Sequence, residues 1–449
     1  MKLSFETYFF SPKCLLNLKK GWTIIASLVT NNPFMMSLSP QLRKSVSGFL
    51  ILLFLPLISF GQTRLPQGGE TGIIGGFAGD QDYPSVSLNQ DGGYVVWEGM
   101  SIGKTNGIGA ARLDASMQKV SIFPVSKITK GTQRTPQVKM LSNGNAIFVW
   151  SGNALKTPDI YARILKEPGV FLTSDLRLNT YLKDSQTAPV VTSLENGGAF
   201  VVWSSFQQDG SLWGIYARTI SPDGKITGNE FGVNQTTQFN QRSPAIATLS
   251  NGNVVAIWIS EQQRFAATLA GVGSVDVYAR IFNSIGSPLS GELLLNSGNN
   301  PCADPSISAL PGGGFTVVWS EKDLANRSNN WEVVGRSFSE SGTAVGGDFK
   351  INSYTYGDQF RPRIATTGNH CEVVWTSLGQ DGSREGVFGR ILQNGTVVSG
   401  DEFRVNTTTP SKQIHPAIAS QGDRVLVLWS SFIAVNGFDL FGQKNSVTQ

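Results

Sequence analysis

Histidine and cysteine, the side chains that metal sites and nucleophilic catalysis use most often, are scarce in this chain, with 2 His and 3 Cys in 449 residues. His370 falls in a turn and His415 at the start of a strand, at opposite ends of their repeats, so a two-histidine metal site is not expected. Cys302 and Cys371 lack zinc-site spacing and should also lie at opposite ends, so no disulfide between them is expected. The sequence predicts neither a metal site nor a cofactor.

Charged residues make up only 15% of the chain. The motifs that bind phosphate or calcium are missing, because the sequence has no glycine-rich phosphate loop and no Asp-x-Asp-x-Asp-Gly loop. Residues 1–61 contain six Lys or Arg and one Glu, which leaves 30 Lys and Arg against 31 Asp and Glu in the rest of the chain. This near-neutral balance, without a basic stripe, argues against nucleic acid as a partner.

A long apolar run lies near the N-terminus, in residues 43–61, RKSVSGFLILLFLPLISFG. Two basic residues, about a dozen apolar ones and a small-residue ending are the plan of a secretory signal peptide, with cleavage expected before Gln62. Met35 or Met36 would be a more ordinary start than Met1. The run is short for a permanent span, although an uncleaved anchor stays an alternative. We expect a secreted, periplasmic or cell-surface protein without a membrane span in the mature chain.

Repetition is what the chain has in abundance. Seven tryptophans recur 53 to 61 residues apart, and each follows a proline by 13 or 14 residues. The prolines are Pro84, Pro136, Pro189, Pro244, Pro305, Pro362 and Pro416, and the tryptophans are Trp97, Trp150, Trp203, Trp258, Trp319, Trp375 and Trp429. A constant inner spacing with a period near 50 residues predicts a repeat architecture.

Each repeat predicts four short strands. A strand opened by the proline (PAIATL, 244–249) leads through an Asn-Gly turn to a valine-rich strand that ends in the tryptophan. A third strand carries a motif such as VYAR (277–280), and a fourth resembles DEFRVN (401–406). Four antiparallel strands repeated seven times predict an all-β, seven-bladed β-propeller over residues 62–449, after a leader of residues 1–61. The repeats lie near residues 76–130, 131–180, 181–236, 237–298, 299–354, 355–408 and 409–449, with 69–76 completing the last.

The two ends of the chain predict how the ring closes. The seventh repeat ends after its third strand, FDLFGQ (438–443), without a fourth. The missing piece stands at the other end, because GGETGIIGGFAGDQ (68–81) precedes the first proline as SGDEFRVNTTTPSKQ precedes the seventh. We therefore expect residues around Thr71 to Gly75 to form the outermost strand of the last blade, so that an N-terminal strand closes the propeller.

Residues that recur in nearly every repeat should be structural. The tryptophans and valines should pack between blades. An arginine ends the third-strand motif in six repeats and an acidic residue opens the fourth strand in five, which predicts a cross-strand ion pair. The arginines are 112, 163, 218, 280, 336 and 390, and the acids are Asp175, Glu230, Glu292, Asp348 and Glu402.

The repeat, with its proline, DGG or NGN turn, VVW, YAR and EFxVN, resembles repeats of large secreted bacterial proteins and short extracellular propeller proteins. The resemblance covers about residues 68–449 and implies a propeller outside the cytoplasm, with binding or adhesion as the expected role. The sialidase box SxDxGxTW and the paired GH and WD signatures are missing, so the resemblance carries over no enzymatic activity and no site residues.

Candidate site residues stand at the start of each first strand, where a propeller opens its central channel. The third residue before the proline is glutamine in six repeats. These glutamines either form a ring of amides that binds a ligand or bond backbone groups. Gln81, Gln359 and Gln413 are the ligand-binding candidates among them. The residue before the proline varies and is chemically active in four contiguous repeats. These four ligand-binding candidates, which we call the arc because their repeats are contiguous around the ring, are Tyr83, Asp304, Arg361 and His415.

Three functions fit this arc. The favoured one is a monomeric extracellular module that binds a glycan or a protein at the channel mouth. The second is a secreted polysaccharide hydrolase or lyase, with His415 as acid or base, Asp304 as its carboxylate partner or an anchor, and Arg361 holding an anionic group. The third is a structural spacer without a ligand. An insertion in the fourth repeat (261–274) could overhang the arc or present Phe265 to a partner, or be a tolerated surface loop.

Overall fold

The computed structural model describes residues 63–448, except 76–78, 103–104, 129, 154–155, 167–168, 263–274, 325–330, 398–399 and 435–436. By its contacts the chain divides into two units, residues 1–61 and 62–449. The predicted leader and its cleavage site lie outside the described residues. No helix among the described residues is long and apolar enough to cross a membrane.

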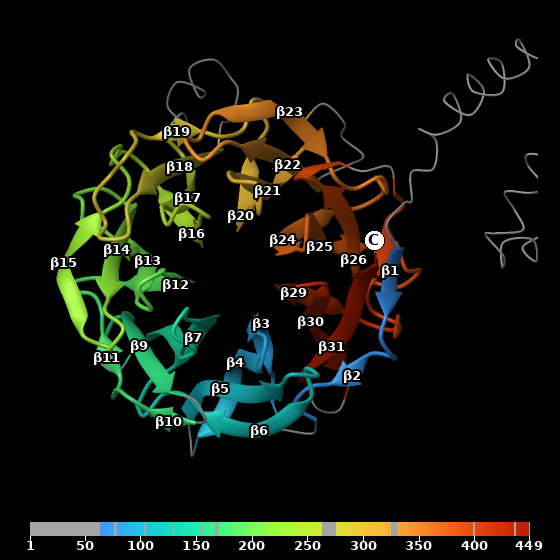
Figure 1. Ribbon diagram of the computed structural model, residues 1–449, viewed down its shortest axis with the longest axis horizontal. Helices are drawn as coiled ribbons and strands as arrows, with labels where there is room; N and C mark the ends of the chain where they lie inside the picture. Colours follow the sequence, from blue (N-terminus) through green and yellow to red (C-terminus); the bar gives the residue numbers. More distant parts are fainter. Residues whose placement is uncertain are drawn as a thin grey trace, which may run out of the picture. The chain divides into compact units, whose positions relative to one another are not determined.

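The described chain forms seven antiparallel sheets in a ring, which confirms the predicted seven-bladed propeller (Figure 1). Blade 1 contains β3 (Asp82–Asn89), β4 (Gly92–Ile102), β5 (Thr105–Asp114) and β6 (Lys119–Pro124). Blade 2 contains β7 (Gln133–Met140), β8 (Ala146–Gly152), β9 (Asp159–Lys166), β10 (Val170–Phe171) and β11 (Leu176–Arg177). Blade 3 contains β12 (Gln186–Ser193), β13 (Ala199–Phe206), β14 (Trp213–Ile220) and β15 (Ile226–Gly232).

The remaining blades follow the same order, with the first strand of each nearest the centre of the ring. Blade 4 contains β16 (Gln241–Thr248), β17 (Val254–Ser260), β18 (Asp276–Phe282) and β19 (Leu293–Leu294). Blade 5 contains β20 (Cys302–Ala309), β21 (Phe315–Lys322), β22 (Trp331–Phe338) and β23 (Ala344–Lys350). Blade 6 contains β24 (Gln359–Thr367), β25 (His370–Leu378), β26 (Glu385–Gln393), β27 (Thr396–Val397) and β28 (Phe403–Arg404). Blade 7 contains β29 (Gln413–Gln421), β30 (Arg424–Ile433) and β31 (Gly437–Thr448).

The N-terminal segment completes blade 7, as expected. In β2 (Thr71–Gly72), Thr71 pairs with Gly442, and the Ile73 amide continues the pairing by donating to the Leu440 carbonyl at 2.8 Å. A second strand, β1 (Thr63–Pro66), also pairs with β31, which the repeat pattern did not predict. The twelve-residue β31 has room for both, because β1 takes its C-terminal end and β2 its middle.

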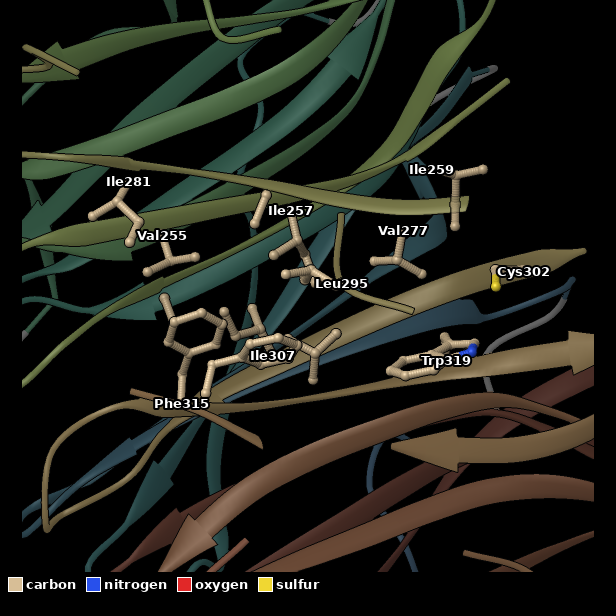
Figure 2. Close-up of a cluster of buried hydrophobic side chains, with 14 of the residues drawn as sticks. Val255, Ile257, Ile259, Val277, Ile281, Leu295, Cys302, Ile307, Phe315 and Trp319 are labelled. Carbon is tan, nitrogen blue, oxygen red and sulfur yellow. The ribbon is translucent and has the colours of Figure 1, made fainter. Parts of the chain in front are cut away.

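The core lies between blades. All seven repeat tryptophans are at most 1% exposed, which confirms their packing role. In one cluster, Val255, Ile257 and Ile281 of blade 4 face Phe315 and Trp319 of blade 5 (Figure 2). One blade alone would leave such apolar faces in water, so each blade needs its neighbours.

The recurrent arginines and acids bind mainly backbone groups, of their own blade and of the neighbouring one, so the predicted pairing within one blade was incomplete. Arg218 of blade 3 donates from Nη1 to the Leu178 carbonyl of blade 2 at 2.7 Å. Glu230 accepts the Thr180 amide of blade 2 at 2.8 Å. The expected ion pair occurs in two blades, between Arg163 and Asp175 at 3.9 Å and between Arg336 and Asp348 at 3.5 Å.

Where the N-terminal segment closes the ring, Glu70 makes the contact that Glu230 makes in blade 3. Its carboxylate accepts hydrogen bonds from the amides of Thr407 at 2.7 Å and Thr408 at 3.1 Å. Burial acts to raise the pKa of Glu70, but these hydrogen bonds outweigh it and hold the pKa below 4.5. The N-terminal segment thus supplies the inter-blade contact as well as the missing strand.

Candidate functional site

The residue before each repeat proline has a left-handed backbone, which sequence rules do not anticipate because a following proline disfavours the helical region. The seven residues are Tyr83, Thr135, Ala188, Ser243, Asp304, Arg361 and His415, with φ between 49° and 55°. Each lies at a register shift between the first two strands of its blade, such as the one between Asp82 and Ser85. Such bulges re-aim side chains, and here all seven residues line one cavity of about 410 Å³ in the central channel.

Tyr83 and His415 are in direct contact at the mouth of this cavity. Their rings stack with centroids 4.2 Å apart and planes 21° from parallel. Arg361 lies near the same ring, with Cζ 5.7 Å from the Tyr83 centroid. Tyr83 remains 39% exposed. The structure therefore brings three of the four predicted arc residues into one cluster, and Asp304 lines the same cavity.

The carboxylate partner of His415 is Asp82, whereas the sequence analysis considered Asp304 for this role. His415 Nδ1 lies 2.5 Å from Asp82 Oδ1, and the Ser430 hydroxyl donates to the same oxygen at 2.7 Å. Burial acts to raise the pKa of Asp82, but the hydrogen bond and charge of His415 together with Ser430 hold it below 3.8. An ionised Asp82 fixes the proton of His415 on Nδ1, which leaves Nε2 as an acceptor while the ring is neutral.

A second carboxyl group, Glu98, stands opposite Asp82 in the register of β3 and β4. Its Oε2 accepts the Thr135 amide at 2.9 Å. Burial raises the pKa of Glu98, and the nearby charge of Asp82 acts in the same direction. The sequence analysis did not name these two carboxyl groups, although their positions could have identified them: Asp82 directly precedes Tyr83, and Glu98 directly follows the repeat Trp97.

The glutamines before the prolines are buried in the blades and do not line the cavity. Gln359 Nε2 donates to the Tyr356 carbonyl and Gln413 Nε2 to the Pro410 carbonyl, at 3.1 and 2.9 Å, and Gln81 bonds the Gly79 carbonyl. These contacts give the glutamines a structural role in the turn that enters each blade. We therefore do not expect Gln81, Gln359 and Gln413 to contact a ligand in the channel.

The mouth face also carries exposed apolar side chains. In a four-stranded antiparallel blade, the loop after the second strand and the loop into the next blade lie at the same end as the start of the first strand. Side chains at this end that are 38% to 76% exposed are Leu182, Leu212, Leu324, Tyr356, Leu378 and Phe432. They surround the polar mouth with the apolar contacts that a binding face needs.

Other predicted features fall outside the site. Phe265 and residues 263–274 of the fourth repeat are not among the described residues. Among the described residues, no group of three His, Cys, Asp or Glu side chains could hold a metal ion. Cys302 and Cys371 are buried free thiols.

Comparison with known proteins supports the fold. No family model and no curated protein matches the sequence. A protein of unknown function from Dyadobacter fermentans superimposes with a TM-score of 0.53 at 9% identity, over 87% of this chain and 100% of that one. An α-L-arabinanase of Penicillium chrysogenum, complexed with arabinobiose, gives a TM-score of 0.46 at 14% identity, over 71% of this chain and 93% of that one.

A GH93 α-L-arabinofuranosidase of Fusarium graminearum, also in complex with arabinobiose, gives a TM-score of 0.46 at 12% identity, over 86% of this chain and 98% of that one. At such identities a likeness concerns the fold alone, because one fold hosts many unrelated functions. This chain is therefore similar to other propellers in architecture, and its function has to be argued from its own residues.

Proposed function

We propose that this protein is an extracellular binding module that recognises a glycan through the mouth of its central channel. The observation that carries the proposal is the cluster of Tyr83, His415, Asp82 and Arg361 over a 410 Å³ cavity. An exposed aromatic face stacks on the apolar face of a sugar ring, while fixed charged groups bond its hydroxyls. His415 and Arg361 restrict the motion of Tyr83, so little conformational entropy is lost when it binds a ligand.

A glycan array probed with the chain from Gln62 onward tests this function. We expect Tyr83→Ala to weaken binding about five- to tenfold, the usual contribution of an aromatic contact. Ile285→Ala is the control, because Ile285 is also 76% exposed but lies in the turn after β18, at the end of the blade opposite the mouth. Binding of no glycan, or equal binding by wild type and Tyr83→Ala, would reject the proposal and favour a protein partner or a spacer.

The hydrolase or lyase alternative has its own support in the carboxyl groups near His415. Asp82 and Glu98 have pKa values shifted in opposite directions, the arrangement by which enzymes separate an acid from a base. In this alternative His415 keeps its role as acid or base and Asp82 replaces Asp304 as its partner. Measuring the sugar released from a polysaccharide that binds distinguishes an enzyme from a binding module. Loss of turnover with retained binding in His415→Ala supports the enzyme.

A further inference from the structure

Below its mouth, the channel wall carries one branched apolar side chain from every blade. The second residue after each repeat proline is valine or isoleucine in all seven blades, and all seven line the cavity. These residues are Val86, Val138, Val191, Ile246, Ile307, Ile364 and Ile418. A charged group in such surroundings is partly desolvated, so its electrostatic interactions are stronger than in water.

Two cationic side chains, Arg363 and Lys139, interrupt this wall and line the same cavity. Arg363 directly follows the proline of blade 6, and Lys139 is the third residue after the proline of blade 2. At these two positions every other blade has an uncharged residue. Neither cation therefore belongs to the repeat pattern, and neither is needed to build a blade.

The protein leaves these cations largely uncompensated. Lys139 makes no hydrogen bond or ion pair with any described residue, and burial lowers its pKa. Arg363 donates from Nη1 to the Pro362 carbonyl at 2.8 Å. Burial lowers the pKa of Arg363 as well. The charge of Asp304 acts to raise the pKa of Arg363, whereas the like charge of Arg361 acts to lower it. Because an unpaired charge away from water is costly, an anion that enters the channel would gain free energy from both cations.

We propose that the channel is an oxyanion site, in which Arg363 and Lys139 hold one carboxylate, sulfate or phosphate group. The planar guanidinium matches two oxygens of such a group, and the ammonium adds a point charge from the far side of the ring of blades. The inference rests on the proposed function only for the source of the anion: an acidic glycan would place a uronate carboxylate in the channel while a sugar ring contacts Tyr83.

The site itself is tested with inorganic sulfate, independently of any glycan. At constant ionic strength, we expect sulfate to raise the melting temperature of the wild-type chain from Gln62 onward. Lys139→Gln and Arg363→Gln should each weaken sulfate affinity at least about tenfold. Lys166→Gln removes the same charge from an exposed position outside the channel and should behave like wild type. No stabilisation by sulfate, or equal stabilisation of all four proteins, would overturn the proposal even if the glycan array is positive.

The melting temperature of each variant without sulfate shows whether that variant is folded. Because Lys139 has no partner among the described residues, Lys139→Gln should melt at the same temperature as wild type or higher. A clear decrease would show that the lysine makes a stabilising contact, which would contradict the proposal.

A second arm identifies the source of the anion by comparing galacturonic acid with galactose. Tighter binding of the acid by at least about tenfold, lost in Arg363→Gln, supports a uronate ligand. Equal binding of the two sugars, with sulfate still bound, assigns the channel to a free inorganic anion and rejects the uronate.

Discussion

Tyr83 and the six equivalent residues place their side chains at the channel mouth by adopting a left-handed backbone, although none of them is glycine or asparagine. This conformation costs non-glycine residues about 1–3 kcal/mol each. The same bulge occurs in the three blades with small residues and in the four with chemically active ones. The strain therefore belongs to the repeat, and the choice of side chain at each bulge is free to serve binding.

Ala188→Gly tests this strain, because Ala188 has φ of 51° and a small side chain. Relief of the strained backbone should offset the entropic cost of glycine, so the free energy of unfolding should stay unchanged or rise by up to about 1 kcal/mol. Ala365→Gly, in an inner strand at ordinary φ, should lose about 1 kcal/mol. Urea unfolding compares the two, and an equal loss in both would show that the Ala188 backbone is not strained.

At the scale of the element, β1 carries one of the most buried ion pairs of the molecule. Arg64 Nε lies 3.3 Å from Glu372 Oε1 of β25, and their side chains are 6% and 1% exposed. The Arg64 guanidinium also stacks 4.1 Å from the ring centroid of Phe403 in β28. Burial raises the pKa of Glu372, against the attraction of Arg64. Through this pair the N-terminal strand holds blade 7 against blade 6.

Arg64→Met should lower the free energy of unfolding by about 3 kcal/mol, because it leaves the Glu372 carboxylate buried without a counter-charge. The double variant Arg64→Met/Glu372→Gln should recover part of the loss, since no buried charge remains. Arg384→Met, at an exposed arginine, is the control and should change stability by less than about 0.5 kcal/mol. Chemical denaturation of the four proteins would contradict this account if Arg64→Met matched the control.

For the whole molecule, the ring predicts cooperative opening, because each blade buries its faces against two neighbours. The two buried cysteines can report it. Burial raises the pKa of Cys371 to about 11 and that of Cys302 well above 9.0, so neither thiol should react with a disulfide reagent at pH 8 while the ring is folded.

Single-cysteine variants of the chain from Gln62 onward, Cys302→Ala and Cys371→Ala, separate the two reporters. If the ring opens as one unit, both thiols should be labelled at the same rate across a denaturant series. Faster labelling of Cys371, which lies one blade nearer the closure, would show instead that the ring opens first at blade 6. Far-ultraviolet circular dichroism on the same samples relates labelling to unfolding of the strands.

The sequence alone was sufficient for the blades, their number and the N-terminal strand that closes the ring. Strands and tight turns are local, so alternation of apolar residues, Asn-Gly turns and the proline-to-tryptophan spacing record them within a few residues of one another. Closure was also readable, because GGETG (68–72) repeats a piece that the seventh unit lacks. Strand β1 could not be predicted from the sequence, because it belongs to no repeat.

The tertiary structure decided which side chains meet. His415 and Asp82 are 333 residues apart, and only closure of the ring brings them within 2.5 Å. The sequence placed four chemically active residues on one arc, but the contacts of His415 depend on the bulge geometry, which no local pattern records. Lys139 and Arg363 likewise line one cavity only because strands of blades 2 and 6 face the same channel. Local periodicity determines an element, whereas a site depends on where distant elements converge.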